Sequence, residues 1–250
     1  MSSTDNREIN EVVDNICNKI KNYYFSIKTK KELEKSQEPS IYHMVHINNL
    51  KSILENGLLS NHIIYNLKDK EITDISNKEV NKRREITEPI YKKSIHDYVP
   101  FYFNPRNAML YSTQSRFSDN IIILELNINK LFKYLFINGS NPILFTNGNA
   151  SKDGTYFTNN PFELFNEEFI NFSDVFKLSW GGSDYIKSTM MSEILIHDNV
   201  PVDFISFIHT QTQEMAIQVI NLLERQNNEH IDIWYGRGKG TCFFGTQLII

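Results

Sequence analysis

Apolar residues along the chain recur with the spacing of both helices and strands. Five of them near the N-terminus are Ile9, Val12, Val13, Ile16 and Ile20. Their helical spacing predicts a first amphipathic helix over residues 8–24. The polar stretch KTKKELEKSQEPS follows and predicts a linker that ends at Pro39. The chain therefore divides into an N-terminal helical extension and linker, residues 1–40, and a main domain, residues 41–250.

The main domain is predicted to open with a strand that leads directly into a helix. Residues 41–44, IYHM, form the strand, and His46 or Asn48 lies near the start of the helix. The apolar stripe of the helix consists of Ile47, Leu50, Ile53 and Leu54. Gly57 is its predicted stop, because glycine readily adopts the left-handed backbone that ends many helices.

Further apolar runs predict strands and helices in an irregular order. The predicted strands are FYF (101–103) between Pro100 and Pro105, IIILEL (121–126), PILF (142–145), EILI (193–196), FISFI (204–208) and IDIWY (231–235). Helices are predicted over 106–111, 128–136 and 214–224, and the basic stretch ISNKEVNKRRE could form another. The chain contains no GxGxxG motif or P-loop before a helix, and it lacks the βαβ rhythm of a doubly wound sheet. The pattern predicts an α+β fold.

Composition indicates a soluble intracellular protein without general affinity for polyanions. Of the 250 residues 40% are hydrophobic, enough for a buried core, and the formal net charge is −4. One stretch differs, because six basic residues stand against three acidic ones between Lys78 and Lys93; most such charge runs are solvated faces. Cys17 and Cys242 could pair but imply no disulfide framework. We find no signal peptide and no apolar run of about 18 residues, so we expect a cytoplasmic location.

Several kinds of catalytic site find no support in the sequence. The seven histidines never combine with a helical acid at HxxxH spacing, and the two cysteines are far apart, so we expect no metal. A Ser-His-Asp hydrolase would need a GxSxG elbow, and a nuclease would need clustered acids. Two residues leave alternatives open. His43 either is an ordinary strand-end residue or faces a ligand, and Glu193 either faces solvent or acts in a cleft.

Five stretches of the chain form a recognisable series. They are IYHMVHINNLKSILENGLLS, ISNKEVNKRRE, DYVPFYFNPRNAMLY, FTNGNA and SEILIHDNVPVDFI. In this order they resemble the motifs of the DarT-type DNA ADP-ribosyltransferase toxins: YHITHxxNLxxILxxGLL, a basic helix ending in paired arginines, DYVPFYFxPRSPMLY, TDGHA and xEFLVxxxVPxxxI. The third match is the most specific, and the glutamate of the last motif is catalytic in the family. The resemblance covers residues 41–235.

The resemblance implies the ADP-ribosyltransferase fold, with a split and strongly bent β-core that holds NAD⁺ in its cleft. By matching position, Glu193 is the catalytic glutamate, Arg84 is the NAD-binding and catalytic arginine, and His43 contacts NAD⁺. Residues expected with them around the nicotinamide and ribose are Asn77, Tyr98, Phe101, Tyr102 and Met109. His46 is then a helix-start residue. The loop before the glutamate, residues 154–191, is expected to recognise the substrate.

The implied reaction transfers ADP-ribose from NAD⁺ to a base of single-stranded DNA. Because the net charge is −4, DNA binding requires a local groove. The residues expected in that groove are Lys78, Lys82, Arg83, Lys92, Lys93, Arg106 and Asn149. The resemblance also implies that the chain is a toxin, and that a macrodomain antitoxin reverses its mark.

Three departures from the family pattern bear on the target base. Val45 replaces a threonine, Asn149 replaces the histidine of TDGHA, and KSTMMS before the glutamate keeps only Lys187 as a cation. The family contains enzymes that modify thymine and enzymes that modify guanine. The absence of the histidine argues against thymine as the target base. Two alternatives remain. One is an ADP-ribosyltransferase that acts on RNA, protein or water, and the other is a non-catalytic binding module of the same fold.

Overall fold

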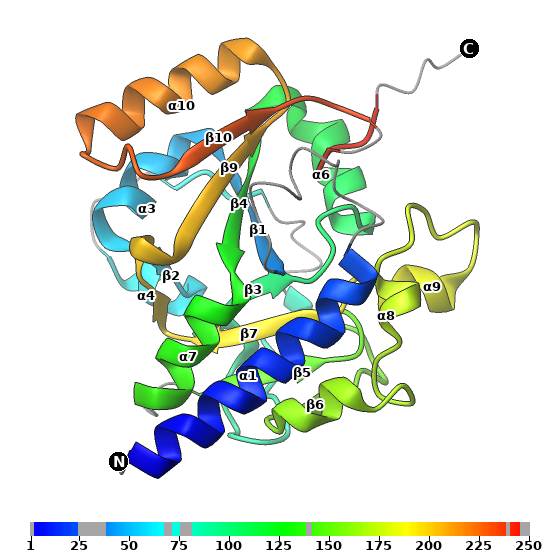
Figure 1. Ribbon diagram of the computed structural model, residues 1–250. Helices are drawn as coiled ribbons and strands as arrows, with labels where there is room; N and C mark the ends of the chain where they lie inside the picture. The colour runs from blue at the N-terminus through cyan, green and yellow to red at the C-terminus, as the bar shows by residue number, and fades with distance from the viewer. Residues whose placement is uncertain are drawn as a thin grey trace.

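A bent β-sheet forms the centre of this computed structural model, and helices pack around it (Figure 1). The structure describes residues 3–24, 39–67, 72–75, 82–138, 142–238 and 241–245. Within these ranges no helix is long and apolar enough to cross a membrane. The predicted linker after residue 24 and most of the stretch ISNKEVNKRRE lie outside the described residues.

The main sheet has the strand order β10-β9-β4-β1-β3-β7-β5-β6. Its strands are β1 (Ser40–His46), β3 (Tyr98–Tyr102), β4 (Ile121–Asn127), β5 (Ile143–Thr146), β6 (Phe157–Thr158), β7 (Glu193–His197), β9 (Ile205–Thr210) and β10 (Asp232–Tyr235). Two short strands, β2 (Leu58–Leu59) and β8 (Asn199–Val200), pair separately. The α+β class predicted from the sequence is confirmed.

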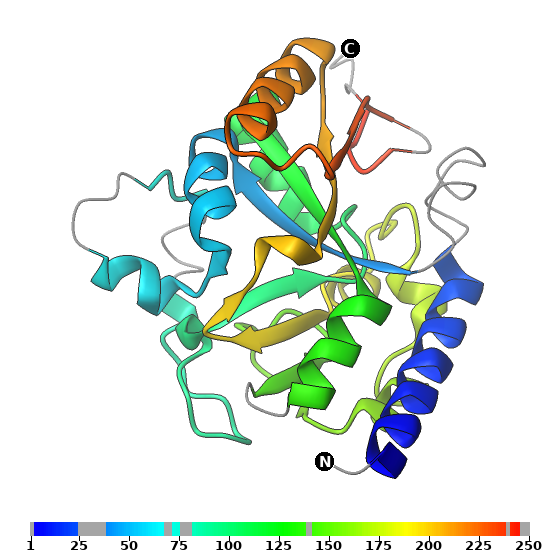
Figure 2. The same ribbon diagram turned by 60° about the vertical axis from the view of Figure 1, so that its left-hand side comes forward.

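The sheet is divided between β1 and β3. Strand β1 pairs with β4 along its whole length, from Ser40↔Asn127 to His46↔Ile121. Its register with β3 consists of the single pair Tyr42↔Tyr102. Strands β4 and β7 consequently run in very different directions in both views (Figures 1 and 2). The split and bent β-core expected from the resemblance is therefore present.

Helices and short 3₁₀ turns connect the strands. The α-helices are α1 (Ser3–Tyr24), α3 (Leu50–Asn56), α4 (Asn61–Asn66), α6 (Ala108–Phe117), α7 (Ile128–Asn138), α8 (Phe172–Val175), α9 (Asp184–Thr189) and α10 (Gln213–Arg225). The 3₁₀ turns are η1 (Ile47–Asn49), η2 (Ile95–Asp97), η3 (Ser118–Asn120), η4 (Pro161–Phe165) and η5 (Val202–Phe204). Helix α10 joins β9 to β10, which run parallel, so one βαβ unit occurs at the end of the chain.

The strand–helix unit that opens the main domain forms as predicted. His46 caps η1, since its ring nitrogen Nδ1 accepts from the Asn48 N–H at 3.2 Å. Gly57 ends α3 with φ +76°. A Cβ atom at this position would lie 2.6 Å from the Val200 carbonyl oxygen, so glycine is required for space as well as for conformation.

Several predicted element boundaries differ from the structure, and two of the differences have a clear local reason. The helix expected over 106–111 begins at Ala108, after Asn107 caps it, and continues to Phe117. The strand expected over 101–103 is β3, which starts at Tyr98 and runs through Pro100. A proline fits there because the Pro100 carbonyl, on the side of β1, bonds to the side chain of His43 and not to the backbone of β1. The Pro100 nitrogen faces the same side, where β1 has turned away, so no ladder hydrogen bond is lost.

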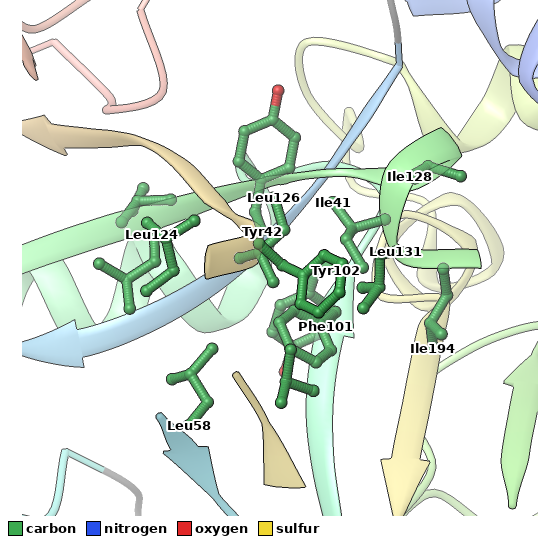
Figure 3. Packing of buried hydrophobic residues seen from close by; sticks show 14 of the residues in the cluster. Ile41, Tyr42, Leu58, Phe101, Tyr102, Leu124, Leu126, Ile128, Leu131 and Ile194 are labelled. Atoms are coloured by element: carbon green, nitrogen blue, oxygen red, sulfur yellow. The ribbon is translucent and has the colours of Figure 1, made fainter. Parts of the chain in front are cut away.

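One continuous hydrophobic core joins the two halves of the sheet. Figure 3 shows side chains from β1, β3, β4, α7 and β7 gathered in this core, among them Ile41, Phe101, Leu131 and Ile194. Helix α1 joins the same core through Val13, Ile16 and Ile20, and it packs against α7, η4 and α8. Cys17 and Cys242 are both buried and are not bonded to each other.

Candidate active site

A buried ion pair joins Glu193, the first residue of β7, to Arg84. The Arg84 Nη2 atom donates to Glu193 Oε2 at 2.8 Å, and Nη1 donates to Oε1 at 3.4 Å. The Glu193 side chain is 0% exposed and that of Arg84 is 12% exposed. A carboxylate buried without a partner would be very unfavourable. Arg84 therefore explains how an acid can begin an apolar strand, and the solvent-facing alternative for Glu193 is excluded.

A tight turn after β5 fixes Glu193 from a second side. The Thr146 hydroxyl accepts from the Glu193 N–H at 2.9 Å and donates to the Gly148 carbonyl at 2.6 Å. The Ala150 N–H donates to Glu193 Oε1 at 3.2 Å. A Cβ atom on Gly148 would lie 2.8 Å from Ser188 Oγ, so the turn and the end of α9 are closely packed. This turn is the FTNGNA motif, and sequence reasoning assigned no role to Thr146 or Ala150.

Tyr102 completes the charged centre. Burial and then the charge of Glu193 raise the pKa of the Tyr102 phenol, so it stays protonated and can donate hydrogen bonds. Burial alone would lower the pKa of Arg84, but the charge of Glu193 and the contacts with Tyr102 outweigh it and raise the pKa. The guanidinium therefore stays cationic. Its planar set of donors suits a phosphate as well as a carboxylate.

His43 lies on β1 across the split from this ion pair. Its Nδ1 is 2.7 Å from the Pro100 carbonyl oxygen, which can only accept, so Nδ1 carries the proton and Nε2 is left as an acceptor. Burial lowers the pKa of His43 to about 4, which makes the ring neutral at physiological pH. The Phe101 ring packs against it with a centroid separation of 5.6 Å. The geometry thus holds one tautomer of the imidazole in place.

A cavity of about 430 Å³ opens in front of these groups. Its polar part is lined by His43, Arg84, Tyr98, Tyr102 and Asn149, and Met109 is also in its wall. Its other part is largely apolar, with Ile53, Leu58, Ile64 and Tyr65 from α3, β2 and α4. A volume of this size and a mixed lining are typical of small-molecule sites. Arg84 lines the cavity and Glu193 does not, so the carboxylate is connected to the cavity through the guanidinium.

Two residues predicted for the site are placed elsewhere. Phe101 does not line the cavity, because neighbours in a strand alternate in direction and its ring points into the core. Arg106, expected in a DNA groove, donates to the Gly238 carbonyl at 2.7 Å and lies over the Phe244 ring at 5.0 Å. These contacts direct its guanidinium toward the C-terminal segment. Asn77 and Lys78 lie outside the described residues.

Four predicted cations lie close in sequence to residues that line the cavity. Lys82 and Arg83 are exposed immediately before Arg84. Lys92 is exposed and Lys93 is half-buried, in a hairpin that leads back to β3. Within the described part of the chain no group of three or more metal-ligating side chains converges.

Comparison with solved structures identifies the fold. The structure of Thermus sp. 2.9 DarT in complex with ADP-ribosylated ssDNA matches this chain with a TM-score of 0.70 at 22% identity. The match covers 84% of this chain and 98% of the Thermus chain. The same Thermus protein in complex with NAD⁺ matches with a TM-score of 0.65. The fold is that of an ADP-ribosyltransferase.

Sequence comparison identifies the family. Residues 42–235 match the family described as "DarT: ssDNA thymidine ADP-ribosyltransferase". A DNA ADP-ribosyl transferase from Thermus sp. (strain 2.9) is 27% identical over 195 residues, which are 75% of this chain and 89% of the relative. A DNA ADP-ribosyl transferase–DNA ADP-ribosyl glycohydrolase fusion protein from Thermosipho africanus is 27% identical over 201 residues, and the match covers 47% of it. The chain belongs to the DarT family, and the predicted class, an NAD⁺-dependent DNA ADP-ribosyltransferase, is confirmed.

Proposed function

We propose that this chain uses Glu193, Arg84 and His43 to transfer ADP-ribose from NAD⁺ to thymine or guanine in single-stranded DNA. The observation that carries the proposal is the buried pair of Arg84 and Glu193 at the inner wall of the cavity. Such a pair offers a cation for a pyrophosphate and an anion for a developing positive charge. Both charges are needed when NAD⁺ loses nicotinamide.

Arg84 and His43 place NAD⁺ in the cavity. Arg84 already faces the cavity, so an incoming pyrophosphate can attract the guanidinium away from Glu193. His43 offers Nε2 to a ribose hydroxyl or to the carboxamide N–H group. Tyr98 and Tyr102 provide flat walls for the nicotinamide ring, and Met109 adds an adaptable apolar contact.

Glu193 acts once Arg84 has moved toward the phosphates. The bond between C1′ of the ribose and the nicotinamide nitrogen breaks, nicotinamide leaves as a neutral molecule, and positive charge builds on the ribose. The carboxylate stabilises that charge. A nitrogen or oxygen of the base then bonds to C1′ and loses its proton to the Glu193 carboxylate. The products are the ADP-ribosylated base, nicotinamide and one proton.

Asn149 is the residue that we propose to read the base. Its amide oxygen accepts from the Ser151 N–H at 2.9 Å and from the Ser151 hydroxyl at 2.5 Å. The amide NH₂ group is therefore the part of Asn149 that can be offered to a substrate in the cavity. Thymine and guanine both carry a carbonyl beside a ring N–H, so both fit a donor of this kind.

The DNA backbone is expected to follow the exposed cations Lys82, Arg83, Lys92 and Lys93, and Lys78 before them in the sequence. A single strand exposes its bases without the cost of unstacking a duplex. Because NAD⁺ and DNA are both intracellular, we propose that the chain acts in the cytoplasm. We also propose that it is a toxin with a macrodomain antitoxin, as the fusion of transferase and glycohydrolase in the Thermosipho relative suggests.

The direct test compares the wild type with Glu193→Ala. Each protein is incubated with NAD⁺ and single-stranded oligonucleotides that differ by one base, and the products are read by intact mass. We expect a gain of one ADP-ribose on oligonucleotides that contain one particular base, and no gain with the variant. Labelling of RNA or protein only, or consumption of NAD⁺ without any labelled polymer, would overturn the proposed acceptor.

A further inference from the structure

A hairpin between Arg84 and β3 has an unusual internal design. Residues 86–95 form it, with the Ile95 N–H donating to the Ile86 carbonyl at 3.1 Å and the Glu88 N–H to the Lys93 carbonyl at 2.9 Å. The teal hairpin projects from the molecule at the lower left of Figure 2. The chain reverses at its tip, and Lys92 adopts a left-handed conformation with φ +60°. A lysine in that region of backbone space is uncommon.

A fully buried carboxylate shapes this tip from within. Glu88 is 0% exposed. It accepts from the N–H groups of Ile90 at 2.7 Å, Tyr91 at 2.9 Å and Lys93 at 2.9 Å. It also accepts from the Tyr98 hydroxyl at 3.1 Å, and Tyr98 lines the NAD⁺ cavity. Burying a charge is unfavourable unless several donors surround it, and here four donors hold the tip in one conformation.

The tip carries a partly exposed aromatic ring, followed in the sequence by two lysines. Tyr91 is 38% exposed, and its hydroxyl accepts from the Asn159 side-chain amide at 3.2 Å. Lys92 is exposed beside it, and Lys93 is half-buried. Asn159 belongs to the 154–191 loop, so Tyr91 joins the hairpin to the segment expected to recognise the substrate. An aromatic face beside positive charges is the usual platform for a base and its phosphate.

We propose that Tyr91 is a base-stacking residue for single-stranded DNA and that Glu88 is a positioning residue that preforms the tip. The inference deepens the proposed function, because it names a contact outside the cavity for a nucleotide beside the modified one. Lys92 and Lys93 hold the neighbouring phosphates. The four hydrogen bonds of Glu88 pre-order the tip, so binding does not have to order it.

The experiment measures binding and turnover separately. Fluorescence anisotropy with a labelled single strand of about 12 nucleotides reports binding without NAD⁺, at two or more salt concentrations. The variants are Tyr91→Ala, Tyr91→Phe and Lys92→Ala. Tyr134→Ala and Lys51→Ala are matched controls, because Tyr134 is 42% exposed and the Lys51 side chain is 65% exposed, both outside the site. The KM values for NAD⁺ and for DNA are then determined for each protein.

Tyr91→Ala is expected to weaken DNA binding about tenfold and to raise the KM for DNA, with the KM for NAD⁺ unchanged. Tyr91→Phe keeps the ring and loses only the bond to Asn159, so it should bind DNA nearly as well as the wild type. Lys92→Ala should reduce the slope of log K against log salt by about 0.7. Equal binding by Tyr91→Ala and the wild type would overturn the inference, as would a loss in Tyr91→Phe as large as that in Tyr91→Ala.

Failure of the proposed function gives a different result. If the wild type modified no DNA, the anisotropy measurement would still compare Tyr91→Ala with Tyr91→Phe. A tenfold difference would then support a single-strand binding platform on a protein with another acceptor. No difference would overturn the platform as well.

Discussion

Replacing Glu193 by glutamine tests the central role of this carboxylate with the smallest change in shape. The substitution Glu193→Gln keeps the size of the side chain and removes its charge. In the wild type the two carboxylate oxygens accept three hydrogen bonds, two from Arg84 and one from the Ala150 N–H. A glutamine offers one oxygen and turns an NH₂ group toward one of these donors. Arg84 loses its counter-charge at the same time.

The expected effect on the rate follows from the charge that develops on the ribose. Loss of a carboxylate at a developing cation removes about 3 kcal/mol or more of transition-state stabilisation, which lowers kcat at least about a hundredfold. The KM for NAD⁺ should not rise, because Arg84 no longer has to leave Glu193 before it meets the pyrophosphate. Breaking a buried ion pair should also cost about 3 kcal/mol of stability, and thereby lower Tm by roughly 6–12 °C.

The assay determines kcat and KM for both substrates by quantifying modified oligonucleotide, with thermal unfolding followed in parallel. Glu55→Gln is a suitable control, since this glutamate on α3 has a 43% exposed side chain and should leave every value unchanged. A kcat for Glu193→Gln within threefold of the wild type would refute the electrostatic role. A large rise in the KM for NAD⁺ would refute the proposed movement of Arg84.

Four further changes test other parts of the site and fold. Arg84→Lys keeps the charge but loses the planar donor pair, so kcat/KM for NAD⁺ should fall about tenfold or more in steady-state assays. Because burial lowers the pKa of His43 to about 4, protonation of His43 should not reduce activity near pH 6.5. A pH–rate profile should show the loss of activity caused by this protonation only as the pH falls toward 4. Burial opposes the charge of His209, but the nearby Cys242 and Glu125 outweigh it and raise the pKa of His209 to about 10. The stability that protonated His209 contributes should therefore be complete below about pH 6.5 and lost as the pH rises toward 10. Urea unfolding at about pH 6.5 and about pH 9.5 should show this loss in the wild type and not in His209→Gln. Gly57→Ala should destabilise the fold by about 2 kcal/mol or more in the same unfolding assay, because its Cβ meets a backbone carbonyl.

Local patterns in the sequence predict the elements that are regular. The run IIILEL is buried along its length and forms β4, and the helical spacing after Ile9 forms α1. The helix over 214–224 appears almost unchanged as α10. His46 is also a local case, since its ring caps the turn that follows it. These features depend on neighbours within a few residues, which the sequence displays directly.

The site depends on contacts between distant segments, and there the sequence is less informative. Glu193 is separated by 109 positions from the arginine that neutralises it, so its burial could not be read from the strand EILI alone. Arg106 looked available for DNA, but the C-terminal segment folds back onto it. The position of Phe101 outside the cavity lining follows from strand alternation, which places Tyr98, Pro100 and Tyr102 on one face of β3 and Phe101 on the other.

Pro100 has a consequence for how the cavity persists. Two neighbouring strands with free N–H and C=O groups tend to pair along their whole length, which would draw β1 and β3 together beyond Tyr42↔Tyr102. Proline cannot donate, and its carbonyl is already taken by His43. Continued pairing is therefore blocked at the point where the cavity begins. The opening between the two halves of the sheet persists because Pro100 has no N–H group to donate to β1, and because its carbonyl group already bonds to His43.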